Sequence, residues 1–291
     1  MKRLVLHLLY LCLALSAGAA RLALMIGVGN YPEGSGWTKI HSANDIALLK
    51  PVYEQQGFVV DTLLDENATH QGIVDALNSL IEQAREDDEI IIHFSCHGQQ
   101  MESRSKKERD GLDEAMVPYD ALRRSSRSYK GQNHLRDKEL DTYLKRLRKK
   151  MGENGKLLVV LDACHSGDAT RGLFDDDCNE PFIGPVRGVS DVFCKNPPYN
   201  KPVKRLKRIF SKLPRIKGFA PMVAICACQP YQRSFEYYDY KTDKTYGSLS
   251  FLVWLELQKM GDIDFVQLGH GVVNNKDYTM RIYQEPYLLE E

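Results

Sequence analysis

The chain has no net charge and, beyond residue 20, no long apolar run. Its 39 basic and 39 acidic side chains cancel, which argues against a general binder of nucleic acid or of membrane surfaces. No segment after residue 20 approaches the roughly 20 consecutive apolar residues that a membrane-spanning helix needs. We therefore expect a monomer with no nucleic-acid partner and no stable membrane anchor.

Nucleotide-binding motifs and paired zinc ligands are also missing. Gly27 and Gly29 are not followed by a third glycine at the dinucleotide spacing, and no Gly-Lys-Ser or Gly-Lys-Thr loop occurs. Cys226 and Cys228 form a Cys-x-Cys pair, but no second pair with ligand spacing accompanies it. These absences favour chemistry without a cofactor.

The first nineteen residues differ from the rest of the chain. A basic start at residues 1–3 precedes a leucine-rich run at 4–15 and a small-residue site with Ala17 and Ala19. This order is typical of a secretory signal peptide and predicts cleavage after Ala19. We therefore predict a signal peptide over 1–19 and one domain over 20–291, periplasmic or secreted.

Two apolar runs each end in chemically reactive side chains. Residues 157–161 lead into Asp162 and Cys164, and residues 90–94 lead into His97. Continuous apolar runs of this length are typical of buried parallel strands. Neighbouring parallel strands end at the same edge of a sheet, so we expect Cys164 and His97 to meet there.

A cysteine nucleophile needs a base and donors for the developing oxyanion. We assign His97 as the base of Cys164, because the adjacent His165 would point to the opposite side of an extended segment. The backbone N–H groups of Gly98 and Cys164 are the candidate oxyanion donors. By the same alternation, Cys96 is expected only to pack in the core.

The alternative to catalysis is that Cys164 is merely a small core residue, which is the commonest role of a cysteine after a strand. The second motif at His97 favours a reactive site. Asp162 should lie on the same side of its strand as Cys164. A carboxylate at the mouth of such a site predicts a substrate with a basic group.

Apolar runs alternate with helical patterns along the chain. The predicted strands cover 22–28, 58–64, 90–94, 157–161 and 222–228, and the predicted helices cover 42–56, 69–84, 137–151 and 246–260. This alternation indicates one α/β domain with a mostly parallel sheet.

Four segments, taken together, resemble metacaspase-type relatives of the caspases. They are SANDI at 42–46, SCHGQ at 95–99, DACHSG at 162–167 and Gln-x-Pro at 284–286. The resemblance implies a caspase-like single domain with a central, mostly parallel six-stranded sheet flanked by helices. It also implies a cysteine endopeptidase with a dyad of Cys164 as nucleophile and His97 as general base.

The resemblance further implies a substrate pocket for Arg or Lys formed by Asp45, Ser95 and Asp162. This agrees with the expectation from Asp162 alone. Peptides or proteins containing Arg or Lys are then the expected substrates. Two other functions stay open, namely a catalytically silent binding module and a transpeptidase that uses the same thiol.

Metacaspases commonly need calcium, and the resemblance makes Asp110, Asp113 and Asp137 weak candidate ligands. Arg136, however, stands where one of the paired acids is expected, and Asp168 is not at the usual position after the nucleophile. Calcium takes about six to eight oxygen ligands, so the loss of two anionic ones should weaken a site badly. We therefore expect no metal cofactor, with a solvated turn as the alternative role of the acids.

A long region from 173 to 218 shows no clear periodicity. Its last part, 201–218, holds eight basic residues and no acidic ones. A solvated linker and a binder of anionic surfaces are two interpretations of such a run. The third is self-processing, because an enzyme selecting Arg or Lys could cut its own basic loop at 201–218.

Overall fold

The computed structural model describes residues 18–104, 111–163, 186–188, 192–194, 211–212, 215–228, 233–275 and 284–291. Cys164 and Asp110 lie outside these residues, as do residues 1–17 of the predicted signal peptide and 201–210 of the basic loop. Of the predicted dyad, the structure therefore describes His97 and the strand that leads to Cys164, but not Cys164 itself.

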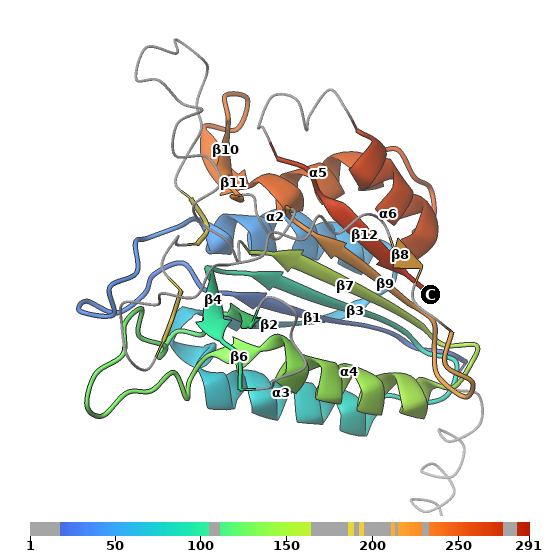
Figure 1. Ribbon diagram of the computed structural model, residues 1–291. Helices are drawn as coiled ribbons and strands as arrows, with labels where there is room; N and C mark the ends of the chain where they lie inside the picture. Colours follow the sequence, from blue (N-terminus) through green and yellow to red (C-terminus); the bar gives the residue numbers. More distant parts are fainter. Residues whose placement is uncertain are drawn as a thin grey trace, which may run out of the picture.

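A seven-stranded sheet forms the centre of the molecule (Figure 1). In sheet order its strands are β2 (Val59–Leu64), β1 (Arg21–Gly27), β3 (Glu89–Ser95), β7 (Lys156–Asp162), β9 (Met222–Cys226), β12 (Tyr287–Glu290) and β8 (Ser211–Lys212). The first five run parallel, and β12 runs antiparallel to β9. The predicted mostly parallel sheet is confirmed, with the two-residue β8 added at its edge.

Helices cover both faces of this sheet (Figure 1). One layer holds α2 (Ser42–Gln55), α5 (Ser248–Leu257) and α6 (Phe265–Asn274), and the other holds α3 (His70–Gln83) and α4 (Asp137–Met151). Strands covered on both faces carry apolar side chains at successive positions, which explains the uninterrupted runs in the sequence.

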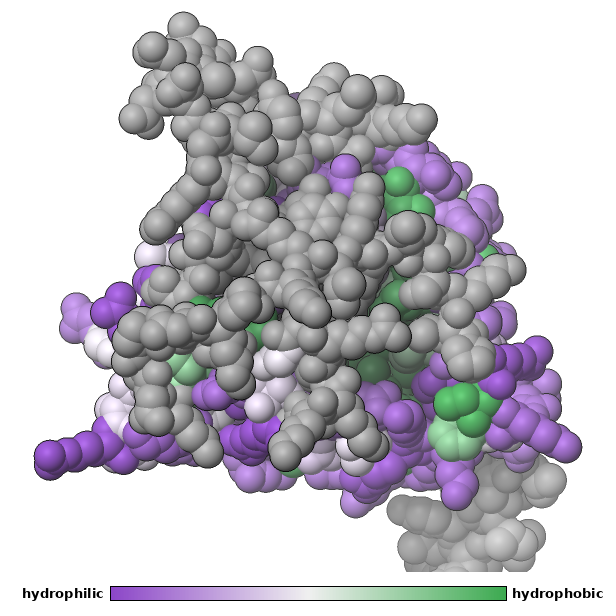
Figure 2. All heavy atoms as spheres, viewed as in Figure 1, coloured by the Kyte–Doolittle hydropathy of each residue, from purple (hydrophilic) through white to green (hydrophobic). Residues whose placement is uncertain are grey.

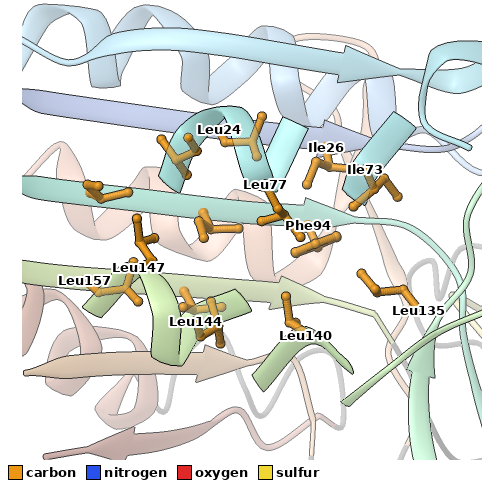
Figure 3. Close-up of a cluster of buried hydrophobic side chains, with 14 of the residues drawn as sticks. Leu24, Ile26, Ile73, Leu77, Phe94, Leu135, Leu140, Leu144, Leu147 and Leu157 are labelled. Carbon is orange, nitrogen blue, oxygen red and sulfur yellow. The ribbon is translucent and has the colours of Figure 1, made fainter. Parts of the chain in front are cut away.

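The sheet separates two hydrophobic cores, and alternate residues of one strand enter different cores. In β1, Leu24 and Ile26 join the core under α3 and α4, whereas Ala23 and Met25 join the core under α2, α5 and α6. Figure 3 shows Leu24 and Ile26 beside Leu77 of α3, with Leu144 of α4 across the neighbouring strands. Each fully buried leucine or isoleucine stabilises the fold by about 1.5–3 kcal/mol.

The predicted helices at 69–84 and 137–151 are present with nearly the predicted bounds. Thr69 caps α3, because its hydroxyl accepts a hydrogen bond from the N–H of Gly72 at 3.1 Å. The prediction of a helix from 246 is wrong at its start. Tyr246 belongs to a hairpin of β10 (Glu236–Asp239) and β11 (Lys244–Gly247), and α5 begins only at Ser248.

Several further elements were not predicted. A three-stranded sheet of β4 (Gly98–Glu102), β5 (Leu112–Met116) and β6 (Leu135–Arg136) follows directly from β3, and α6 packs beside α5. A 3-10 turn, η1 (Asp65–Asn67), follows β2.

Of the helices in the described ranges, none combines the length and apolarity that crossing a membrane requires.

The surface of the described part of the chain is mostly polar. Figure 2 shows hydrophilic residues around the rim of one face. Within the described ranges, the large apolar side chains with substantial exposure are Val59, Ile216, Tyr240 and Val266. Isolated apolar residues of this kind are normal on a globular protein.

Candidate active site

The strands that precede His97 and Cys164 are direct neighbours. In the parallel pair of β3 and β7, Ser95 is in register with Asp162. The pairing continues past the strand end, because the N–H of Cys96 donates to the carbonyl of Asp162 at 3.2 Å. The strands that lead to His97 and to Cys164 therefore end at the same edge of the sheet, and the meeting of the two side chains there stays a prediction, because Cys164 lies outside the described residues.

Aromatic rings and backbone contacts hold His97 in place. Its ring lies 5.1 Å from that of Trp37, in a stacked arrangement, and 5.2 Å from that of Tyr31. The N–H of His97 donates to the Tyr31 hydroxyl at 3.0 Å, and that hydroxyl donates to the carbonyl of Val117 at 2.9 Å. The imidazole therefore has little freedom to turn.

The hydrogen bonds of His97 define its tautomer. Nε2 lies 2.8 Å from the carbonyl oxygen of Thr38, and a carbonyl only accepts, so Nε2 carries the proton. Nδ1 is buried and has no hydrogen-bond partner among the described residues. An unpaired buried nitrogen is unusual, and its lone pair is the position from which a general base would act.

Burial also sets the protonation state of His97. Loss of solvent lowers its pKa to about 4, although the hydrogen bond to Thr38 raises it in part. At neutral pH the imidazole is therefore uncharged and able to accept a proton. Burial raises the pKa of the neighbouring Cys96 to about 12, so this thiol stays protonated and has the packing role predicted for it.

The structure brings together the three residues predicted to form the basic-side-chain pocket, and all three are buried. The Ser95 hydroxyl donates to Oδ2 of Asp45 at 2.7 Å, and the N–H of Gly247 donates to its Oδ1 at 2.7 Å. Asp162 accepts at Oδ2 from the N–H and the hydroxyl of Ser250, at 2.8 and 2.7 Å. Both carboxylates are thus fixed by neighbouring donors.

An arginine of the same chain lies among these residues. Nη2 of Arg187 donates to Oδ2 of Asp45 at 2.7 Å and to Oε1 of Glu236 at 2.9 Å. Nη1 donates to the Ser95 hydroxyl at 2.7 Å and lies 3.8 Å from Oδ2 of Asp162. The Arg187 side chain is 0% exposed. Burial alone would lower its pKa, but the three carboxylates raise that pKa above its ordinary value.

Glu236 is the pocket residue that sequence reasoning missed. It stands on β10, buried, and its carboxylate accepts from the N–H of His41 at 2.7 Å and lies 2.7 Å from Nδ1 of the same residue. We call Asp45, Asp162 and Glu236 the acidic cluster. Burial raises the pKa of Asp45 to about 7, with Arg187 acting in the opposite direction, so the guanidinium does not fully offset the desolvation of Asp45.

Gly247 makes room for the guanidinium. A Cβ placed on this residue would lie 2.1 Å from Oδ2 of Asp162 and 2.6 Å from Cζ of Arg187. Any side chain at 247 would therefore displace the arginine or the carboxylate. The glycine at the end of β11 is a requirement of the cluster, although no sequence motif marks it.

Two of the weak calcium candidates, Asp113 and Asp137, lie in the described ranges, and both are engaged by groups of their own chain. The carboxylate of Asp113 is bound by Arg136 at 2.6 Å and by Lys138. Burial would raise the pKa of Asp113, but hydrogen bonds from Lys138, Ser103 and Arg136 lower it overall. Asp137 accepts from the N–H of Lys138 at 2.8 Å. No group of three metal-ligating side chains occurs in the described ranges, and two cations already neutralise Asp113.

A mostly parallel sheet flanked by helices, with a buried histidine and an acidic cluster at one edge, defines a caspase-type domain. The sequence matches the caspase domain family over residues 20–253. The chain therefore belongs to this family of cysteine peptidases.

Its similarity to metacaspases confirms the resemblance inferred from the motifs. Metacaspase-3 of Arabidopsis thaliana is 31% identical over 155 residues, which cover 50% of this chain and 39% of that protein. Metacaspase-1 of Schizosaccharomyces pombe is 29% identical over 158 residues, which cover 51% of this chain and 34% of that protein. The match thus spans well under half the length of these relatives.

A solved structure shares the fold. The crystal structure of protein GSU0716 from Geobacter sulfurreducens superposes with a TM-score of 0.63 at 20% identity and covers 93% of each chain. At this identity the likeness concerns the architecture alone.

Proposed function

We propose that the protein is a cysteine endopeptidase that cleaves after Arg or Lys, using Cys164 and His97. The observation that carries the proposal is the acidic cluster, whose carboxylates close around a guanidinium at the edge where the dyad is expected. Planar carboxylate pairs are the preferred partners of an arginine side chain. A lysine ammonium would meet the same charges through a single nitrogen, whereas the guanidinium contacts them through both Nη1 and Nη2.

The residues divide the reaction between them. His97 takes the thiol proton of Cys164 on Nδ1, and the thiolate adds to the carbonyl carbon of the scissile bond. The N–H of Gly98 donates to the developing oxyanion. His97 then delivers its proton to the leaving amine, and water hydrolyses the thioester. Because burial lowers the pKa of His97, its imidazolium returns the proton readily.

Selectivity is tested with fluorogenic peptides that carry Arg, Lys, Leu or Asp at the cleaved position. We expect turnover of the first two only, and Asp45→Asn should lower kcat/KM for the arginyl peptide by about 10- to 100-fold, the effect of about 1.4–3 kcal/mol. Asp141→Asn, at an exposed pair with Lys145, is the matched control and should leave kcat/KM unchanged. Equal turnover of leucyl or aspartyl peptides would contradict the proposal.

The nucleophile is tested by two cysteine variants. Cys164→Ala should abolish hydrolysis, whereas Cys96→Ala should retain it, because the Cys96 thiol is buried and protonated. A silent binding module would instead fail to react with a basic thiol-directed peptide. A transpeptidase would give ligated product when an amine acceptor is added.

We also propose export with cleavage after Ala19. The N–H of Ala20 donates to Oδ1 of the buried Asp88 at 2.7 Å. Cleavage at this bond would turn that nitrogen into an ammonium group facing a carboxylate, a stronger interaction than the amide makes. N-terminal sequencing of exported protein should begin at Ala20, and retention of Met1 would refute the proposal.

The peptidase is further proposed to act as a monomer, without metal, and to process its own chain. Size-exclusion chromatography with light scattering tests the first point. Self-cleavage within 201–218 is tested by the fragments of the wild-type protein against those of Cys164→Ala. If the wild-type protein and Cys164→Ala both give one identical band after long incubation, the proposed self-cleavage is wrong.

A further inference from the structure

The short segment 186–188 lies at the active-site edge and is bridged to the chain at both of its ends, Val186 antiparallel to Phe235 and Gly188 to Gly98. The N–H of Arg187 donates to the carbonyl of Ser234 at 2.9 Å, and the N–H of Gly98 donates to the carbonyl of Arg187 at 3.2 Å. The backbone of Arg187 is thus held on both sides while its side chain enters the acidic cluster.

These contacts are the ones expected of a bound substrate. An extended peptide recognised by a protease pairs with a free strand edge and places alternate side chains in pockets. The carbonyl of the residue in the selective pocket then meets the oxyanion donor. Gly98, the donor that contacts the carbonyl of Arg187, is also the oxyanion donor that the sequence predicts.

The alternative is that Arg187 forms a purely structural ion pair, which would account for its side-chain contacts but not for its backbone contacts. A buried arginine that only neutralised Asp45, Asp162 and Glu236 would need its guanidinium in the acidic cluster and nothing more. It would not require its own carbonyl oxygen to accept from the residue next to the catalytic histidine. The side-chain contacts and the backbone contacts are independent, and both place Arg187 in the position of the residue after which the enzyme cuts.

We propose that the Arg187–Gly188 peptide bond is a self-cleavage site of this protein, in addition to the cut proposed in 201–218, and that it is cut within the same chain. The inference rests on the proposed function. It differs from the predicted cut in 201–218, because Arg187 lies ahead of that basic run and is itself docked in the acidic cluster.

The step uses only groups of the chain and water. The Sγ thiolate of Cys164 adds to the carbonyl carbon of Arg187, and the C–N bond to Gly188 breaks. The nitrogen of Gly188 receives the proton that His97 took from the thiol. Water then adds to the thioester, releases Arg187 as a new C-terminal carboxylate and restores the Cys164 thiol.

Two kinetic properties follow from the docked geometry. The cut is intramolecular, so its half-time should not change across a wide dilution series. Because the Arg187 side chain has no exposed surface, the acidic cluster is closed to other substrates until the new C-terminus leaves. Hydrolysis of arginyl peptides should therefore show a lag that ends as the cut proceeds.

The wild-type protein provides the first test. Intact-mass analysis and N-terminal sequencing after incubation should reveal a fragment that begins at Gly188, absent from Cys164→Ala. Arg187→Gln should lose this fragment and Arg187→Lys should retain it. Arg215→Gln serves as the matched control, since Arg215 is exposed in the described part of the same region, and it should be cut like the wild type.

The outcomes separate this inference from the proposed function. If the wild type hydrolyses arginyl peptides but yields no fragment starting at Gly188, the self-cleavage site is wrong and the peptidase proposal stands. If neither the peptides nor the chain is cut, the proposed function itself fails. A half-time that shortens with protein concentration overturns cleavage within one chain. If Arg187→Gln does not fold, the presence or absence of the Gly188 fragment in the wild-type protein still tests the proposed site.

Discussion

Three buried histidines should make the protein lose stability as the pH falls below their ordinary range. Nε2 of His93 lies 3.0 Å from the Ser250 hydroxyl, and His134 lies between the Tyr129 hydroxyl at 2.8 Å and Oε1 of Gln99 at 2.9 Å. Burial lowers the pKa of His93 and of His134 to about 3, and the pKa of His97 to about 4. All three are uncharged in the folded protein at neutral pH.

The size of the effect follows from proton linkage. Histidines in the unfolded chain bind protons below pH about 6.5, whereas these three in the folded chain do not. For each histidine, the free energy of unfolding therefore falls by about 1.4 kcal/mol for every pH unit below that value. Asp45 acts in the opposite direction, because its pKa is raised to about 7 and the folded chain keeps a proton there. The net loss is about 3 kcal/mol per pH unit between pH about 5.5 and 4.5.

The assay is urea unfolding followed by the fluorescence of Trp37 and Trp254 at several pH values. The free energy of unfolding should fall with the slope given above, and His134→Gln should reduce that slope by about half, from two net protons to one. His270→Gln is the matched control, because that side chain is 45% exposed. A free energy of unfolding that stays constant between pH 7 and 5 would refute the reasoning.

The remaining predictions concern the acidic cluster, the C-terminus and the metal. Glu236→Gln should lower kcat/KM for arginyl peptides by about 10-fold or more, because it removes one buried ion pair; steady-state kinetics check this, and an unchanged value contradicts it. Arg148→Met should destabilise the fold by about 3–5 kcal/mol in urea unfolding. The reason is that the buried guanidinium pairs with Glu291 at 2.8 Å and donates to the Ala220 carbonyl at 2.7 Å. A loss below about 1 kcal/mol, which is the range of a surface ion pair, would contradict this prediction. A calcium chelator should leave peptide hydrolysis unchanged, because Asp113 is already paired with Arg136.

Much of the fold follows from local pattern. The apolar runs at 90–94 and 157–161 predict adjacent buried strands, and the structure pairs them in register at Ser95 and Asp162. The helix at 137–151 follows from a stripe of leucines spaced three or four residues apart. Elements with weaker patterns were missed, such as α6, whose apolar face is interrupted by two glycines.

The candidate site was only partly predictable, for a physical reason. Asp162 was found because strand alternation places it on the side of Cys164. Arg187 reaches the acidic cluster from a segment between β7 and β9, and Glu236 joins it from the β10–β11 hairpin. The ion pair of Arg187 with Asp45 joins residues 142 positions apart. No periodicity records such a contact, because it depends on how the connections fold over the edge of the sheet.

The acidic cluster has a consequence for the rate at which substrates arrive. If Arg187 departs as proposed, the acidic cluster loses its cation while it stays backed by a low-dielectric wall of buried groups. Such a recess focuses its field outward and accelerates the capture of positively charged molecules, an effect that salt weakens within a Debye length of about 8–10 Å. The departure of one arginine thus changes the site from a neutralised interior into an attractor for basic chains.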